Sequence, residues 1–173
     1  MKDLDKIKML RESTSLGISD CKNALKESDG DFSKALELLK KKGISVMEKK
    51  KGRTASQGLI EAYIHFGGNL GAMVEVNCET DFVAKTEVFK RFVKDLAMHV
   101  AAASPKYLDK NEIKEDELKN VSDADEYIKE TCLLKQAFVK DNSRTIEDYL
   151  HEVVSQTGEN VVIKRFVRYS LGE

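Results

Sequence analysis

Residues 58–78 read GLIEAYIHFGGNLGAMVEVNC, and this stretch decides the fold of the larger part of the chain. Its first half alternates with a period of two, and we expect the apolar members to share one buried face: Ile60, Ala62, Ile64 and Phe66. Gly67-Gly68-Asn69 indicates a hairpin loop, because these residues tolerate positive φ angles. The alternation resumes at Leu70 and continues to Cys78. The stretch therefore predicts two antiparallel strands, each with one face in the core.

Downstream of residue 86 the pattern changes to the helical period. The strongest helical stripe in the chain consists of Phe89, Phe92, Val93, Leu96, Ala97 and Val100. Pro105 is expected to close this helix. Residues 106–122 are acidic and polar, which is typical of an irregular connection, and residues 127–137 are expected to be helical.

A further helix and a strand are expected at the C-terminal end. Residues 145–157 are expected to form the helix, and Gly158 to end it. Its inward face would carry Ile146, Tyr149, Leu150 and Val153. Residues 161–167 are expected to form a strand, broken at Lys164 and Arg165, that completes an antiparallel sheet. The larger unit is thus predicted to be an α+β core, in which helices pack on a three-stranded antiparallel sheet.

Residues 3–43 are predicted to form three short helices with a small common core. The apolar faces expected to meet there are Leu4, Ile7 and Leu10 in the first helix, Cys21, Ala24 and Leu25 in the second, and Phe32, Ala35, Leu36 and Leu39 in the third. Ser19 and Asp31 are expected N-caps, because their side-chain oxygens can accept from unpaired backbone N–H groups. Lys22 would point outward, and Gly43 is the expected left-handed residue after the third helix.

The composition turns polar and basic between these two units. Residues 46–57 contain Lys49-Lys50-Lys51-Gly52-Arg53, which is typical of a linker. We therefore divide the chain into an N-terminal three-helix domain at residues 1–45, a basic linker at 46–57 and an α+β core at 58–173.

The composition and the charge balance argue against several classes of protein. The chain has 173 residues with 29 Lys and Arg against 30 Asp and Glu, and this balance argues against a dedicated nucleic-acid or membrane binder. No stretch approaches the roughly 18 apolar residues that a membrane span needs. Three distant cysteines (Cys21, Cys78 and Cys132) favour reduced thiols over a disulfide framework or a zinc site. The first residues lack the features of a signal or transit peptide, so we expect a cytoplasmic protein.

The sequence shows none of the common patterns for catalysis or cofactor binding. It lacks a phosphate-binding glycine loop, a nucleophile elbow and a zinc-binding histidine pair, and His65, His99 and His151 share no ligand spacing. We therefore expect a binding protein rather than an enzyme, with no cofactor and no metal of its own. The basic runs at residues 40–42 and 49–53 have no interleaved aromatic residue for base stacking, so a solvated surface is preferred over an RNA site.

The segment Asn77-Cys78-Glu79-Thr80-Asp81-Phe82-Val83-Ala84-Lys85 runs from the end of the second strand into the start of a helix. It is open to two interpretations. In the structural one, Thr80 caps the helix, Asp81 complements the helix dipole, and Phe82 begins the apolar stripe seven residues before Phe89. In the functional one, the same residues bind a partner.

This segment resembles the signature of the elongation factor Ts family, in which an Asn-x-Glu-Thr-Asp-Phe-Val-Ala stretch follows the second strand of the core. Two further matches lie in the same order as in that family. Residues 10–14 (LREST) and 20–25 (DCKNAL) resemble its ubiquitin-associated-like N-terminal domain. Residues 158–162 (GENVV), followed by Arg165-Phe166, form the match near the C-terminus. Together the three matches span nearly the whole chain.

The resemblance implies a guanine-nucleotide exchange factor for the translation GTPase elongation factor Tu. Such a factor binds both the GDP-bound and the nucleotide-free partner, and it speeds GDP release without a chemical step. The resemblance further implies that Phe82 is a wedge between two helices of the partner, beside the partner's magnesium site. Asp81 would help to displace the magnesium-binding arrangement, and Thr80 and Val83 would shape the loop.

The resemblance also implies a second contact with the partner, through Ile18, Ser19 and Lys22 of the N-terminal domain. Many members carry two methionines where Ile18-Ser19 stands here, and Cys21 is expected to pack in the core instead. Longer members contain two copies of the core, whereas short members pair as homodimers. The short chain therefore implies a noncovalent homodimer, in which residues 58–173 also serve for dimerisation.

Two other functions are compatible with the residues. The N-terminal helices alone would suit an interaction module for a peptide or a ubiquitin-like partner, which needs no role for residues 80–83. A pull-down with residues 1–45 separates this module from an exchange factor. RNA binding, the third function, would collapse with salt and depend on residues 49–53.

Overall fold

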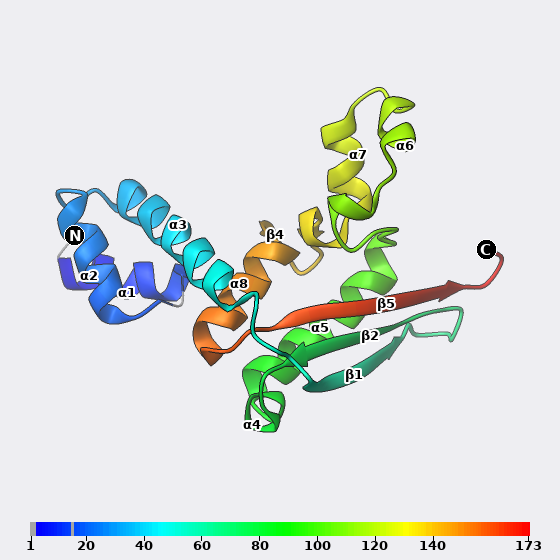
Figure 1. Cartoon of the computed structure of the whole chain (residues 1–173), viewed down its shortest axis with the longest axis horizontal. Coiled ribbons are helices and arrows are strands. Elements are labelled where there is room, and N and C mark those ends of the chain that lie inside the picture. The colour runs from blue at the N-terminus through cyan, green and yellow to red at the C-terminus, as the bar shows by residue number, and fades with distance from the viewer. Residues whose placement is uncertain (1–2, 15) are drawn as a thin grey trace.

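The structure is a computed structural model that describes residues 3–14 and 16–173, except for the side chains of residues 44 and 46–48. It begins with three helices: α1 (Asp3–Thr14), α2 (Ile18–Glu27) and α3 (Phe32–Lys50). They form a small bundle at one end of the molecule (Figure 1). The core of this bundle consists of Leu10, Leu16, Cys21, Ala24, Leu25, Ala35 and Leu39. Asp31 caps α3 as predicted, because its carboxylate accepts from the amide of Lys34 at 3.1 Å.

Two local predictions for α1 and α2 were wrong. Leu4 is 80% exposed, because the packing of α1 on its neighbours buries only Leu10 fully. Ser19 does not cap α2, since that helix already begins at Ile18 after Gly17, and no side chain caps it. The helical period therefore identified the inner face of α2 correctly, whereas the capping preference of Ser19 misplaced the first residue of the helix.

The predicted end of the third helix was also wrong. The α3 helix continues through Gly43 to Lys50, so the predicted linker at residues 46–57 begins inside a helix. A glycine in a helix costs only about 1 kcal/mol relative to alanine, which packing can offset. The α3 helix packs on α8 (Ile146–Thr157), and at its end the Lys50 ammonium donates to the carbonyl of Val154 at 3.5 Å.

The larger part of the chain is built on an antiparallel sheet. Its strands, in spatial order, are β1 (Gln57–Ile64), β2 (Leu70–Cys78) and β5 (Val162–Ser170). The predicted hairpin joins β1 to β2, and Gly67 and Gly68 both have positive φ angles there. Opposite Glu75 and Val76 the register shifts, and Lys164 is the extra residue of β5. The break predicted in the last strand is therefore a bulge inside a continuous strand.

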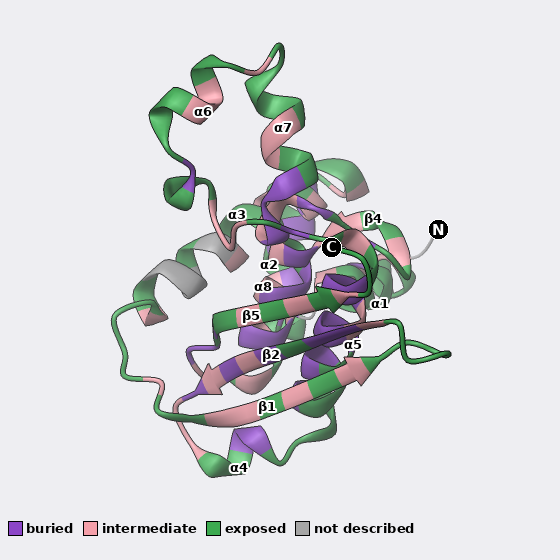
Figure 2. Ribbon diagram, turned by 90° about the vertical axis from the view of Figure 1, so that its right-hand side faces the viewer, coloured by how far each residue is buried: buried purple, intermediate pink, exposed green. Residues whose placement is uncertain are grey.

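Two helices build the core on one face of this sheet. The long helix α5 (Glu87–Ala103) lies across all three strands, and α8 packs against α5 (Figures 1 and 2). Every residue of the predicted stripe from Phe89 to Val100 is buried. Thr145 caps α8 in a reciprocal arrangement with Asp148, and Gly158 ends the helix in the left-handed region as predicted. The α+β fold, with N-terminal helices and a three-stranded antiparallel sheet packed with helices, is thus confirmed.

The predicted buried face of β1 was wrong. Leu59 and Tyr63 pack toward the core, whereas Ile60 and Ile64 are 63% and 67% exposed. Both alternating sets of β1 contain apolar side chains, so the period of two does not decide which set faces the helices. We call the uncovered side the open sheet face, and Figure 2 shows the strands in front of α5. Its cross-strand rows are Ile60-Glu75-Arg165, Ala62-Met73-Val167 and Ile64-Gly71-Tyr169.

An arm of residues 104–145 connects α5 to α8 and projects from the body of the molecule (Figure 1). Its elements are the 3-10 turns Lys110–Glu112 and Leu133–Lys135, helices α6 (Glu115–Lys119) and α7 (Ala124–Thr131), and strands β3 (Ala137–Phe138) and β4 (Asp141–Thr145). The Glu117 carboxylate accepts from the hydroxyls of both Tyr107 and Tyr127, which holds α6 beside α7. The sequence predicted no helix within 106–122 and a longer one at 127–137, because the short helices of the arm depend on such side-chain contacts rather than on an apolar stripe.

The buried ring of His99 ties this arm to α5. Its Nδ1 accepts from the amide of Val139 at 3.3 Å, and its Nε2 donates to the side-chain oxygen of Gln136 at 3.0 Å. Because one ring nitrogen accepts a hydrogen bond, the imidazole is neutral. Gln136 in turn donates to the carbonyls of Ala103 and Glu130. Burial lowers the pKa of His99, against the smaller opposing effect of the Gln136 hydrogen bond.

Acidification is therefore expected to destabilise the fold through His99. An unfolded histidine titrates near 6.5. Because the folded ring binds its proton only at a lower pH, the free energy of unfolding should fall below pH ~6.5, by at most about 1.4 kcal/mol per pH unit for this group. The loss should level off once the pH lies below the folded pKa. Urea unfolding at a series of pH values measures the slope.

The matched variants for this test are His99→Asn and His65→Gln. The first should flatten the slope between pH 7 and pH 5, whereas the second removes an exposed histidine and should leave the slope unchanged. Burial also lowers the pKa of His151, so a residual slope is expected in His99→Asn. Equal slopes in His99→Asn and the wild-type chain would exclude the proposed role of His99.

Candidate functional site

Residues 80–84 form a short, tightly fixed projection between β2 and α5. Thr80 caps the four-residue helix α4 (Asp81–Ala84), and its hydroxyl oxygen accepts from the amide of Val83 at 3.4 Å. Val83 and Ala84 are buried in the main core, which anchors the projection from below. Thr86 then caps α5 by accepting from the amide of Phe89 at 3.3 Å. The two caps define the path of the backbone on both sides of α4.

The ring of Phe82 lies outside the core and is 78% exposed. The structural interpretation, in which Phe82 begins the stripe that contains Phe89, was therefore wrong on this point. The helical phase is interrupted between the two residues, because α4 ends at Ala84 and α5 begins only after Thr86. Burial of such a ring would stabilise a fold by roughly 1.5–3 kcal/mol, and this fold forgoes that contribution.

A carboxylate lies next to the exposed ring. Asp81 is the first residue of α4 and pairs with the ammonium of Lys85 at 2.6 Å. The hydrogen bond from Lys85 lowers the pKa of Asp81, so the group is ionised at neutral pH. Both side chains are exposed, and an exposed pair of this kind contributes little to stability. The tip of the projection thus presents to solvent one aromatic ring and one carboxylate that is paired with Lys85, while Val83 anchors the tip in the core.

Sequence reasoning gave no role to Glu159 and Asn160, which form hydrogen bonds with Thr80 and Glu79. The signal that pointed to them was the match of residues 158–162 to the elongation factor Ts family, which gave the residues without a function.

The second set of predicted contact residues lies on α2. Ile18 is 57% exposed, and Ser19 and Lys22 are also exposed, so all three are accessible on the first turns of this helix. Cys21 is fully buried, as expected, and burial raises the pKa of its thiol. Figure 1 shows α2 in the N-terminal bundle and α4 below the sheet. The structure therefore does not bring the two predicted sets of residues together into one site.

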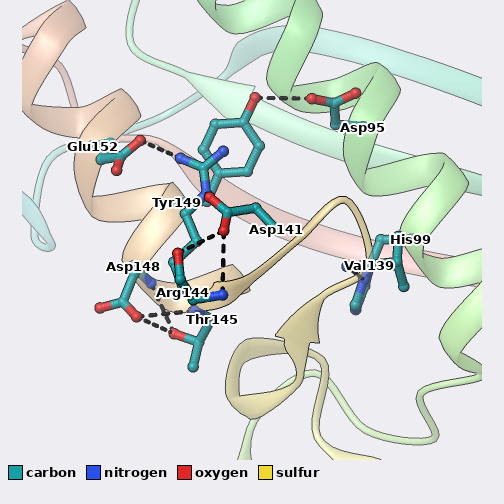
Figure 3. A network of polar contacts seen from close by, with 10 residues as sticks. Asp95, His99, Val139, Asp141, Arg144, Thr145, Asp148, Tyr149 and Glu152 are labelled. Atoms are coloured by element: carbon teal, nitrogen blue, oxygen red, sulfur yellow. Dashed lines mark hydrogen bonds and ion pairs between the residues drawn. The ribbon is translucent and has the colours of Figure 1, made fainter. Parts of the chain in front are cut away.

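A further polar cluster lies between β4, α5 and α8 (Figure 3). Arg144 pairs with Glu152 at 2.6 Å, and its guanidinium carbon lies 4.2 Å from the centre of the Tyr149 ring. The Tyr149 hydroxyl donates to the carboxylate of Asp95 at 3.1 Å. Burial raises the pKa values of Tyr149 and Glu152. Since each of these groups is engaged by a partner in the cluster, we assign the cluster the structural role of fastening β4 and α5 to α8.

The described residues contain no group of three or more His, Cys, Asp or Glu side chains placed to hold a metal ion. None of the helices within residues 3–14 and 16–173 is both long and apolar enough to cross a membrane.

Comparison with known proteins places similarity along nearly the whole chain. A family model described as Elongation factor TS matches residues 23–125 and 123–173. Elongation factor Ts of Caldanaerobacter subterraneus subsp. tengcongensis is 45% identical, over 96% of this chain and 95% of the relative. Elongation factor Ts of Thermoanaerobacter sp. is also 45% identical, over 96% and 93%, and that of Geobacter metallireducens is 43% identical, over 95% and 87%.

Proposed function

The chain belongs to the elongation factor Ts family, whose members are translation elongation factors, and from this premise we propose that it is a guanine-nucleotide exchange factor for elongation factor Tu. It would bind the GDP-bound partner, weaken the partner's hold on GDP and Mg²⁺, and bind the nucleotide-free form tightly. The process needs no chemical step, so the factor is not an enzyme in the usual sense. The proposal places the protein in the cytoplasm, with a protein as its partner rather than a nucleic acid or a membrane.

The observation that carries this proposal is the exposure of Phe82 on a fixed projection. The ring is 78% exposed, whereas Val83 beside it is only 8% exposed. An aromatic ring is large and rigid, and it loses little conformational entropy when it is immobilised. A ring held in this way is suited to enter a partner's surface as a wedge.

The partner's nucleotide site is sensitive to such a wedge. GDP is held in GTPases by backbone N–H groups and a lysine around its phosphates, and by Mg²⁺. Mg²⁺ demands nearly ideal octahedral geometry, so a small shift of its supports weakens it strongly. Asp81 would act beside the wedge as a fixed negative charge near these supports, with Thr80 and Val83 holding the loop in shape.

Linkage gives the proposal a quantitative form. If binding of the factor costs the GDP site about 4 kcal/mol, the affinity for GDP falls roughly a thousandfold. GDP must then weaken the complex of the two proteins by the same factor. A factor that bound both forms of the partner equally would not change the affinity for GDP at all.

The test is the release of fluorescently labelled GDP from elongation factor Tu, chased with excess unlabelled GDP. Increasing concentrations of the wild-type chain should raise the release rate until it saturates. Saturating GDP should lower the affinity of the chain for elongation factor Tu. The chain should lower the affinity of elongation factor Tu for GDP by the same factor. A release rate that does not depend on the chain would refute the exchange function.

We propose that the N-terminal domain supplies a second contact, through Ile18, Ser19 and Lys22. Lys22→Glu is expected to raise the dissociation constant of the complex about tenfold, because it places a like charge against a surface that suits a lysine. The maximal release rate at saturating factor should stay within about twofold, since α2 lies in a different part of the molecule from α4. Release rates measured over a range of factor concentrations separate the two parameters.

The matched control is Lys34→Glu, which makes the same change at an exposed position of α3. It should alter neither the affinity nor the maximal rate. Equal effects of the two substitutions would point to a general charge effect and remove Lys22 from the interface.

We propose further that two copies of the chain pair through the open sheet face. Its side chains include Met73, Val167 and Tyr169, which are 48%, 39% and 73% exposed in the single chain. A sheet with one bare apolar face is ordinarily covered by a second layer. The pairing would be noncovalent, because the three cysteines are all buried inside the chain.

A further inference from the structure

Two loops that are far apart in the sequence form hydrogen bonds with each other at the start of α4, the helix that carries the exposed Phe82 ring. The amide and the hydroxyl of Thr80 donate to the two carboxylate oxygens of Glu159, at 3.0 Å and 2.6 Å. In return, the amide of Asn160 donates to the carboxylate of Glu79 at 2.6 Å. Each loop thus uses an acidic side chain to bind the backbone of the other. Charge-assisted hydrogen bonds of this kind are roughly twice as strong as neutral ones.

The contact with Glu159 acts on the cap of α4. Because the Thr80 hydroxyl donates its proton to Glu159, its lone pairs are available to the amide of Val83, which lies 3.4 Å away. The α4 helix has only four residues, and a helix of that length is not stable by its own hydrogen bonds. The direction of Phe82 therefore depends on the anchors at both ends of α4.

Glu159 in turn is fixed to the core. It directly follows Gly158, the left-handed residue that ends α8. The neighbouring Asn160 is buried, and its side-chain amide donates to the carbonyl of Arg53 at 2.8 Å. Arg53 lies 3.5 Å from the carboxylate of Glu79, which closes the network. The Glu159 carboxylate is thus held in place beside the end of α8, where it accepts both hydrogen bonds from Thr80.

We propose that Glu159 is a positioning residue for nucleotide exchange, which holds α4 in the orientation that presents Phe82 and Asp81 to the partner. The inference rests on the exchange function proposed above. A loop that is already ordered in its binding conformation loses less entropy when it binds. Without the carboxylate, Thr80 loses the acceptor for two donors at once, and the ring is presented in several orientations instead of one.

The variant that tests this role is Glu159→Gln, which keeps the size of the side chain but removes its charge and one of its two acceptors. We expect the maximal rate of factor-stimulated GDP release to fall about tenfold. The melting temperature should change by less than about 4 °C, because Glu159 is only partly buried. The amides of Thr80 and Val83 should exchange their hydrogens faster than in the wild-type chain.

A double variant that combines Glu159→Gln with Phe82→Ala distinguishes positioning from a general structural role. Its rate of GDP release is compared with that of Phe82→Ala alone. If Glu159 acts by holding the ring, the double variant should release GDP at the rate of Phe82→Ala alone, within about twofold. The matched control is Glu147→Gln, which removes a carboxylate that lies on α8 and pairs with Lys135 of the arm, and it should leave the release rate unchanged.

Three outcomes would decide against the inference. If Phe82→Ala slows release but Glu159→Gln does not, the positioning role is overturned while the exchange function stands. If Glu159→Gln slows release equally in both backgrounds, its role is a general structural one. If the wild-type chain itself does not speed release, the exchange function fails, and unchanged amide exchange at Thr80 and Val83 would then also exclude Glu159 as the anchor of the loop.

Discussion

Replacing Phe82 by alanine is expected to lower the factor-stimulated rate of GDP release by about a hundredfold. A central aromatic side chain of an interface contributes about 3 kcal/mol when it fills a pocket, which corresponds to a factor of that size. The fold should not change, because the ring is 78% exposed and leaves no cavity when it is removed. Stopped-flow release of labelled GDP at saturating factor measures the rate, and thermal unfolding checks the fold.

Phe66→Ala is the matched control for this substitution. Phe66 is 96% exposed at the end of the β1–β2 hairpin, so the variant removes an equally accessible phenylalanine at a position remote from α4. Its release rate should stay within about twofold of the wild-type value. A Phe82→Ala variant that still gives full acceleration would show that the exposed ring is not the wedge, whatever the family of the chain.

The second large effect is expected from a charge on the open sheet face. Met73 lies at the centre of this face, in the middle row of the central strand β2. In a symmetric dimer Met73→Glu would place two unpaired charges in an apolar interface, which costs several kcal/mol and raises the dissociation constant of the dimer more than a hundredfold. Light scattering should then report the mass of one chain in place of two.

The substitution should leave the single chain folded, because Met73 is 48% exposed before any pairing. Val139→Glu is a matched control at a site that is 40% exposed on the β3–β4 turn, and it should keep the mass of the dimer. A wild-type chain with the mass of one copy, or a Met73→Glu variant with the mass of two, would contradict pairing through this face.

The elements of the core are encoded locally and could be predicted from the sequence. The stripe from Phe89 to Val100 specifies α5, because a helix brings residues three and four apart onto one face. Thr145 and Gly158 mark the two ends of α8, since capping involves only residues within one turn. The two-stranded hairpin follows from the glycines at 67 and 68. In each case the interactions that decide the structure lie within a few residues along the chain.

The local sequence pattern could not predict which face of a strand or helix is covered by its neighbours. In β1, Leu59 and Ile60 are both apolar, and only the packing of α5 against Leu59 and Tyr63 decides that Ile60 and Ile64 remain outside. The continuation of α3 beyond Gly43 likewise depends on its contact with α8. These choices depend on elements distant in the sequence, which a periodic pattern does not specify.

The candidate site depends both on local sequence patterns and on tertiary packing. The sequence alone determined that Thr80 caps a helix, that Asp81 follows it and that residues 77–85 match the signature of a translation factor family. Only the tertiary structure decided that Phe82 lies outside the core and that Glu159 holds Thr80 in place. The physical reason is distance along the chain: a cap is made by neighbouring residues, whereas the exposure of a ring and the contact between residues 80 and 159 arise only when the strands and helices have packed together.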